Sequence, residues 1–206
     1  MLVDSRRAVE LSWERWAAER GVHNASLLQL AHGRRTSESL PEIAPHLDLA
    51  TEVANLEQIE SEEVRGLFPV PGARELLGAL GSQEWAIVTS GSRKVALTRM
   101  RVGGIPTPGV FVTANDVQRG KPAPDSYLSA ASRLGVASNN CVVIEDTSVG
   151  VAAGKAAGMQ VIALLGTEKR DALGDADIIA ATLADITVER QVHGGLIITV
   201  LREQSR

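Results

Sequence analysis

Residues 141–164, CVVIEDTSVGVAAGKAAGMQVIAL, contain a complete strand–helix–strand unit and decide the fold class. Apolar runs at 141–144 and 161–165 predict two strands that are buried on both faces. Between them, Thr147 or Ser148 can cap a helix rich in glycine and alanine, which ends at Gly158. Two parallel strands joined by a helix that packs close to them are the repeating unit of an α/β fold.

The rest of the chain divides into two parts with different patterns. Residues 5–68 have helical periodicity: Val9, Trp13 and Ala17 recur at helical spacing, and LATEVANLEQIESEEVRGL predicts a helix ending near Gly66. Residues 69–206 add apolar runs at 85–89, 110–113 and 178–179, and a C-terminal hairpin at 194–195. We expect a Rossmann-like parallel sheet core with the hairpin at its edge, a helical cap domain at 5–68, and a hinge at 68–72.

Composition narrows the classes of function. The 206 residues are 44% hydrophobic and 22% charged, with a net charge of −4 and basic residues interspersed among acidic ones. This distribution is not typical of a protein that binds nucleic acid or an anionic membrane surface. No stretch has the length of a membrane span, and the single Cys141 suits a reducing compartment. We therefore predict a cytoplasmic protein with a small-molecule ligand.

Three strand ends carry polar residues, and ligand sites in parallel sheets lie at the carboxyl ends of strands. In AIVTSGSRK, Thr89 and Ser90 offer hydroxyls, Gly91 lets backbone N–H groups approach a ligand, and a helix begins after Ser92. The combination suits a phosphate group. Taken alone, however, the stretch is more typical of an ordinary capped turn.

The second strand end is followed by RGKPAPDSYLSAASRLG, in which a helix is predicted from near Pro124 to Gly135. Lys121 stands just before this helix, where the helix dipole disfavours a cation by about 0.3–1 kcal/mol. An anion shared between the ammonium group and the helix end would explain the position. A lone lysine on a loop is otherwise more often solvated.

The third strand delivers Glu145 and Asp146 to its carboxyl end. Adjacent carboxylates repel each other unless a positive charge lies between them, and Mg²⁺ prefers such oxygen ligands. Because side chains alternate along a strand, one carboxylate can bind the metal while the other supports it. Which of the two binds directly stays open. The alternative is a capping aspartate beside a surface glutamate.

The ordered combination of these turns resembles the haloacid dehalogenase-like hydrolases. VTSGSR, GKPAPDSYLSAASRLGV and VVIEDTSVGVAAGKAAGM look like the second, third and fourth motifs of that family. HGRRTSESL and FVTANDVQRGKPAPD are similar to its sugar-phosphatase branch, which includes glycerol-phosphate and 2-deoxyglucose-6-phosphate phosphatases. The resemblance covers nearly the whole chain and implies a Mg²⁺-dependent phosphatase of small sugar or polyol phosphates.

The resemblance also implies roles for single residues. Thr89 or Ser90, with the Gly91 N–H, would hold the phosphoryl group, and Lys121 would neutralise it. Asp146, with Glu145 beside it, would anchor Mg²⁺. The helical cap would close over the substrate. Four cap residues would lie near the substrate, although a plain polar loop is as typical for each of them: His32, Arg34, Arg35 and Thr36.

The first motif of the family, a strand ending in Asp-x-Asp-Gly, has no counterpart in the chain, which begins at the residues that follow it. Residues 1–4 would be the remnant of that motif, and Asp4 falls beyond the glycine turn. The two missing carboxylates are the nucleophile and the general acid/base. We hypothesise that Met1 is an internal position of a longer protein.

Two other functions remain open. A phosphosugar mutase of the same fold would need a cap that binds a second phosphate, for which Arg34 and Arg35 are candidates. A non-catalytic phosphosugar-binding protein would result if Met1 is the true start.

Overall fold

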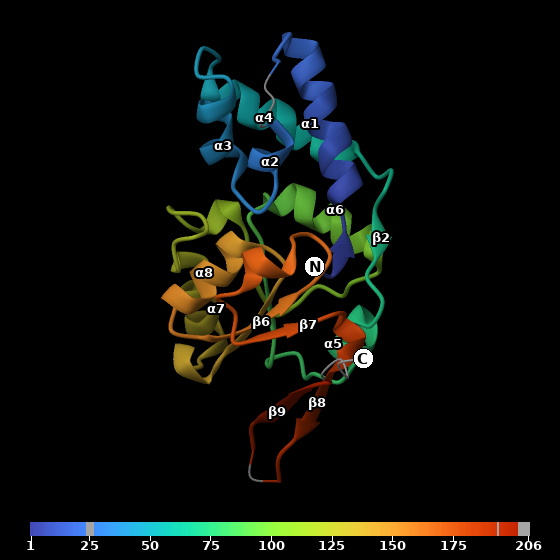
Figure 1. Ribbon diagram of the computed structural model, residues 1–206, viewed down its shortest axis with the longest axis vertical. Helices are drawn as coiled ribbons and strands as arrows, with labels where there is room; N and C mark the ends of the chain where they lie inside the picture. Colours follow the sequence, from blue (N-terminus) through green and yellow to red (C-terminus); the bar gives the residue numbers. More distant parts are fainter. Residues whose placement is uncertain (24–26, 193, 202–206) are drawn as a thin grey trace.

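The computed structural model describes residues 1–23, 27–192 and 194–201. Four helices gather at one end of the molecule, an α/β unit forms the middle, and a hairpin projects from the other end (Figure 1). The four helices, which we name the helical unit, are α1 (Arg6–Arg20), α2 (Leu27–Ala31), α3 (Thr36–Ile43) and α4 (Leu49–Glu62).

The helical unit has an apolar core of its own. Trp13 and Trp16 are almost completely buried, and their rings meet edge to face at 6.0 Å. The same core encloses Glu52, whose carboxylate accepts hydrogen bonds from Trp16 Nε1 at 2.7 Å and Arg20 Nε at 2.9 Å. Helix α4 ends at Glu62, earlier than the predicted end near Gly66, because Ile59 is the last residue that it buries.

The α/β unit confirms the predicted fold class. Its strands are β3 (Ala86–Val88), β4 (Val110–Val112), β5 (Val142–Glu145), β6 (Gln160–Leu164) and β7 (Ile178–Ala180). Its helices are α5 (Ala73–Gly78), α6 (Arg93–Gly103), α7 (Asp125–Leu134) and α8 (Ser148–Ala156). Short 3-10 turns lie at Ala114–Asp116, Ser138–Asn140, Arg170–Leu173 and Leu183–Asp185. Within the described ranges, no helix is long and apolar enough to cross a membrane.

The parallel strands form two sheets rather than one. Strands β3 and β4 pair with each other, and β5, β6 and β7 form a second sheet in that order. Among the described residues, none pairs with the second edge of β3 or of β5. All three residues of β4 are buried, whereas all three of β3 are only half-buried. The apolar strand β3 therefore lacks the cover that a fully paired parallel strand usually has.

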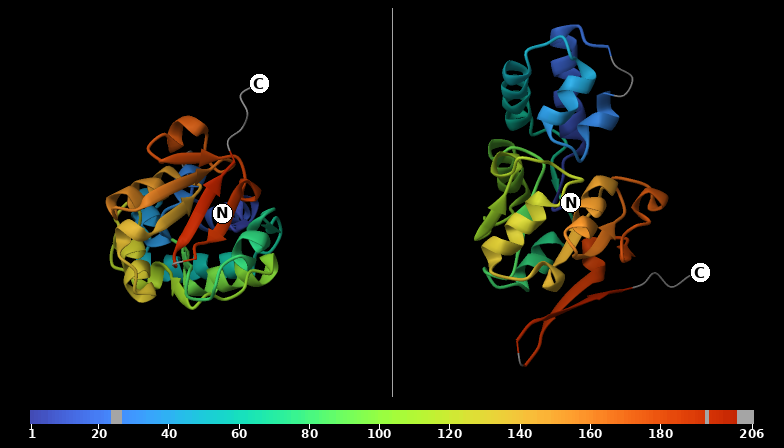
Figure 2. Two further views of the ribbon diagram at one scale, coloured as in Figure 1. Left: turned by 90° about the horizontal axis from the view of Figure 1, so that it is seen from below. Right: turned by 90° about the vertical axis from the view of Figure 1, so that its left-hand side faces the viewer.

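The two chain segments that join the units pair with each other. Strand β1 (Val3–Asp4) runs antiparallel to β2 (Phe68–Pro69), with Val3 opposite Pro69. The predicted hinge at 68–72 thus lies beside the N-terminal segment. The N-terminus itself lies at the junction between the segment with α6 and α7 and the segment with β6 and α8 (Figure 2, right).

The C-terminal hairpin consists of β8 (Ile186–Arg190) and β9 (Leu196–Val200), which form an antiparallel sheet of their own. The prediction that it lies at the edge of the parallel sheet is wrong. The hairpin instead uses one face for packing, because Val188, Ile198 and Val200 lie against the apolar core that also contains Leu76 and Leu77 of α5.

Helix α8 packs so closely on the sheet that replacing its Gly154 by alanine should destabilise the protein, whereas the same replacement at Gly78 of α5 should not. A Cβ at Gly154 would lie 2.8 Å from Val161 Cγ2 and 3.4 Å from Val143 Cβ. Gly154→Ala should therefore lower the free energy of unfolding by about 1–3 kcal/mol, as overpacking does. Gly78→Ala is the matched control, because no atom lies within 4 Å of its added Cβ. It should be neutral or stabilise by up to about 1 kcal/mol. Urea denaturation measures both, and equal effects would contradict the prediction.

Candidate functional site

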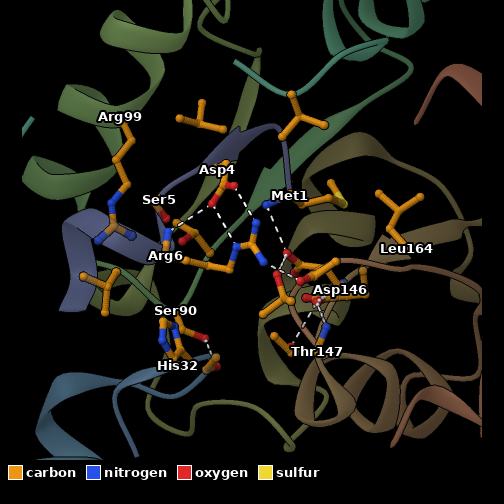
Figure 3. Close-up of a pocket in the computed structure, with 18 of the residues that line it drawn as sticks. Met1, Asp4, Ser5, Arg6, His32, Ser90, Arg99, Asp146, Thr147 and Leu164 are labelled. Carbon is orange, nitrogen blue, oxygen red and sulfur yellow. Dashed lines mark hydrogen bonds and ion pairs between the residues drawn. The ribbon is translucent and has the colours of Figure 1, made fainter. Parts of the chain in front are cut away.

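A cavity of about 490 Å³ lies where the helical unit meets the carboxyl ends of β3 and β5. Its lining includes residues from all three predicted strand ends: Thr89, Ser90, Gly91, Lys121, Glu145 and Asp146. The expectation that these stretches converge is therefore met by the structure. Figure 3 shows Ser90 beside His32 of the helical unit, and Asp146 facing Met1.

The turn after β3 is held by hydrogen bonds of its own. The Gly91 N–H donates to Thr89 Oγ1 at 3.1 Å, and Ser92 caps α6 by accepting from the Val95 N–H. The Ser90 hydroxyl donates to the carbonyl of Gly33 at 2.8 Å, so it joins the turn to the helical unit. The N-terminus of α6 thus opens near the cavity with its first turn already capped.

Lys121 is not a solvated loop lysine. Its side chain is only 7% exposed, and its ammonium group forms an ion pair with Glu145 Oε1. Its Nζ also lies over the ring of Tyr127, 4.9 Å from the ring centroid. The buried carboxylate of Glu145 thus compensates the unfavourable position of the Lys121 charge just before the N-terminus of α7.

Glu145 is the centre of a buried network. Besides Lys121, its carboxylate accepts from the Tyr127 hydroxyl at 2.6 Å and from the Asp146 N–H at 2.9 Å. Burial alone would raise the pKa of Glu145, but the Lys121 ammonium and these donors together hold that pKa below its usual range. A Cβ at Gly150 would overlap this carboxylate, so the first turn of α8 can close over it only because that residue is glycine.

Asp146 has a different environment from its neighbour. Its Oδ2 accepts from the Thr167 hydroxyl at 2.7 Å and lies 3.3 Å from the α-ammonium of Met1. Its side chain is 21% exposed and lines the cavity. A positive group thus already lies against this carboxylate. Within the described part of the chain, no three His, Cys, Asp or Glu side chains form a group that could hold a metal by themselves.

Mg²⁺ fits these donors without such a group. The ion usually keeps several waters and takes only one or two protein carboxylates. Asp146 is the more exposed carboxylate at the cavity, and its hydrogen bond with Thr167 and its ion pair both use Oδ2, whereas both oxygens of Glu145 are hydrogen-bonded in the interior. Asp146 is therefore the better candidate for a direct ligand, and Glu145 for a supporting group.

The loop that carries the four predicted substrate residues lies partly in the cavity. His32, Arg34 and Thr36 line it, and Arg35 does not. Burial lowers the pKa of His32. Arg34 pairs with Glu42 at 2.5 Å, within the helical unit.

Sequence reasoning missed several residues of the cavity. The Arg6 guanidinium donates hydrogen bonds to the Asp4 carboxylate and to the carbonyl of Gly166, so the Asp4 carboxylate is already paired with a positive charge. Arg99 of α6 pairs with Glu60 of α4 at 3.2 Å, and burial raises the pKa of Glu60 although Arg99 opposes the shift. Helical periodicity gives no sign of such pairs, because a charged residue at these positions is also typical of an exposed helix face.

Comparison with known proteins finds hydrolases and phosphatases among the proteins that this chain resembles. A family model described as haloacid dehalogenase-like hydrolase matches residues 1–164. Hexitol phosphatase A of Escherichia coli is 43% identical over 202 residues, covering 96% of this chain and 94% of that protein. Glycerol-1-phosphate phosphohydrolase 2 of Saccharomyces cerevisiae is 34% identical, covering 91% of this chain and 80% of its own length. A solved hydrolase from Pseudomonas syringae has a TM-score of 0.79 at 23% identity, covering 90% and 91%, which is a likeness of fold.

The buried pair predicts a large effect for removing one partner. Lys121→Met leaves the Glu145 charge buried without its ammonium, and should lower the free energy of unfolding by about 3–5 kcal/mol at neutral pH. Lys155→Met is the matched control. It breaks a half-exposed ion pair with Asp177, and should cost less than about 1 kcal/mol. Urea denaturation at one pH compares them.

The same variant should also reverse a pH dependence. In the native protein the pKa of Glu145 is lowered, so its contribution to stability is present above the unfolded pKa and is lost as the pH falls. Without Lys121, burial raises this pKa, and the variant gains stability as the pH falls. The difference between the two proteins should therefore narrow from about pH 8 to about pH 5. A constant difference would show that Glu145 is not the partner that matters.

Proposed function

The chain belongs to the haloacid dehalogenase-like hydrolases, and we propose that it hydrolyses small sugar or polyol phosphates as a phosphatase. One observation supports this most strongly. Thr89, Ser90 and Gly91 of the turn after β3, together with Lys121 and Asp146, all line one cavity. Anion-binding groups beside a carboxylate that can hold a cation suit a phosphate ester.

The residues present can bind and orient the phosphoryl group. The turn at 89–91 lies at the start of α6, where backbone N–H groups and the helix dipole favour an anion. Lys121 would add a fixed positive charge, because the Tyr127 ring and Glu145 hold its ammonium in place. Fixed charges in a partly buried site stabilise developing negative charge more strongly than water does.

Mg²⁺ would be held by Asp146, with Glu145 as the supporting carboxylate. When bound, the ion would neutralise charge on the phosphoryl oxygens. Thr167 supports this role, because its hydroxyl fixes one oxygen of Asp146 at 2.7 Å.

The nucleophile would lie on a further strand between β3 and β5. Both strands have an edge that no described residue pairs with, and the half-buried Val88 and Ile144 line the cavity. A strand parallel to both would end at this cavity and could present Asp-x-Asp there. One carboxylate would attack phosphorus while the ester bond breaks, and the other would give the departing alcohol a proton. Water, losing a proton to that second carboxylate, would then cleave the aspartyl phosphate.

The substrate class follows from the relatives and the helical unit. One relative is named for hexitol phosphates and another for glycerol 1-phosphate, and both names describe phosphate esters of polyols. The helical unit would serve as the cap, with His32, Arg34 and Thr36 near the polyol hydroxyls. Both relatives are named for phosphate hydrolysis, which favours a phosphatase over a mutase.

Adding an Asp-x-Asp-Gly motif before Met1 provides the test of catalysis. The chain is expressed with a short apolar strand and Asp-x-Asp-Gly fused before Met1. It should hydrolyse p-nitrophenyl phosphate with Mg²⁺ at least about 10⁴-fold faster than the chain from Met1, because removing a nucleophile costs that much or more. The same fusion with its first Asp changed to Asn is the control. If the fusion folds and binds phosphate but hydrolyses nothing, a binding protein is favoured; transfer of phosphate between positions of a sugar would favour a mutase.

The metal role of Asp146 has a separate test. In the extended chain, Asp146→Asn should raise the Mg²⁺ concentration for half-maximal activity at least about tenfold, because a carboxylate ligand loses its charge. Asp171→Asn, at an exposed position, is the control and should leave it unchanged. An unchanged Mg²⁺ response in Asp146→Asn would rule out this ligand.

A further inference from the structure

The loop at residues 33–35 and the first turn of α3, which follows it, together contact all three turns of the cavity. The Gly33 carbonyl accepts from Ser90 in the turn after β3. A Cβ on Gly33 would lie 2.9 Å from Val149 Cγ2 and 3.3 Å from Thr147 Cβ, so the loop also lies closely against the start of α8. The third contact is made by Arg35 and Glu38 with the core loop at 117–120, which directly precedes Lys121.

The third contact consists of polar bonds to the backbone of the core loop. Arg35 Nη1 donates to the carbonyl of Gln118 at 2.8 Å and to that of Val117 at 3.3 Å. Glu38 Oε1 accepts from the Gly120 N–H at 2.9 Å. The Arg35 side chain is only 17% exposed, and its Nε is buried with no hydrogen-bond partner. Arg35 is therefore committed to the boundary between the two units.

Gly120 gives independent support for this close approach. Its φ is not among the positive values, so its backbone conformation does not require glycine. A Cβ there would overlap the Arg35 side chain and the Glu38 carboxylate. The missing side chain is thus explained by the space that the helical unit takes.

We propose that Arg35 and Glu38 form a clasp that fixes the loop at 117–120 and thereby positions Lys121. The clasp is made only while the helical unit lies against the α/β unit. Lys121 follows Gly120 directly in the chain. The position of its backbone therefore decides whether its ammonium group can lie between the Glu145 carboxylate and the Tyr127 ring. Arg35 and Glu38 are positioning residues, which differs from the substrate contact that the sequence predicts for Arg35.

Two NMR signals of the full chain test the clasp without any catalysis. Glu38→Ala should make the Gly120 amide exchange about tenfold faster or more, because it loses a charged acceptor. The ε-methylene resonances of Lys121, shifted by the ring current of Tyr127, should move toward unshifted values. Glu38→Gln keeps an acceptor oxygen and should restore both signals. Gly120→Ala, which blocks the clasp sterically, should move the Lys121 resonances in the same direction as Glu38→Ala.

Two controls separate the clasp from a general loss of stability. Glu42→Ala changes an acidic residue of the same helix whose ion pair stays within the helical unit. It should leave both signals unchanged. The Val161 amide, which donates to Asp177 in the core, should exchange at its native rate in Glu38→Ala.

Three results would overturn the proposal: an unchanged Gly120 amide in Glu38→Ala, fast exchange of the Val161 amide in the same protein, or a faster Gly120 amide with unmoved Lys121 resonances. Because neither signal needs turnover, failure of the proposed phosphatase activity would leave this test intact.

Discussion

The buried carboxylate of Glu145 is the constraint on which the arrangement of the site depends. A charge in the interior is tolerated only with a partner of opposite sign and with hydrogen bonds to its remaining lone pairs. Lys121 supplies the charge, and Tyr127 and the Asp146 N–H supply hydrogen bonds. These partners come from the loop before α7, from α7 itself and from the turn after β5. One carboxylate thus joins two of the three strand ends, and its closeness to α8 requires Gly150.

The burial of Glu145 also gives the two adjacent carboxylates different roles. Glu145 is the last residue of β5 and is buried, whereas Asp146 follows the strand and is 21% exposed at the cavity. The buried group fixes a lysine, and the facing group remains able to meet a cation. The edges of β3 and β5 that no described residue pairs with border the same cavity, so the further strand proposed above would end at this cavity.

The features that could be predicted from the sequence are those that a local pattern of residues determines. The strands of the α/β unit are doubly apolar runs with polar ends, so their positions and the convergence of their carboxyl ends could be predicted. The packing of the hairpin could not, because the same alternation fits an edge strand or a separate sheet. The Glu38–Gly120 bond joins residues 82 positions apart, and no local pattern encodes it. Tyr127 could not be identified from the sequence either. Its place in the pattern of α7 is that of a core residue, and its hydrogen bond to Glu145 depends on a residue distant in the sequence.

The boundary between the two units differs in chemistry from the core of each. The helical unit buries its tryptophans internally, whereas it meets the α/β unit through polar groups, including Ser90 with Gly33 and Arg99 with Glu60. Separating such a boundary exposes groups that water can satisfy, so it costs far less than opening an apolar core. Burial raises the pKa of Glu60 although the neighbouring Arg99 opposes the shift. Because its apolar core is its own, the helical unit would keep that core if the polar boundary opened, as the proposed role of a cap requires.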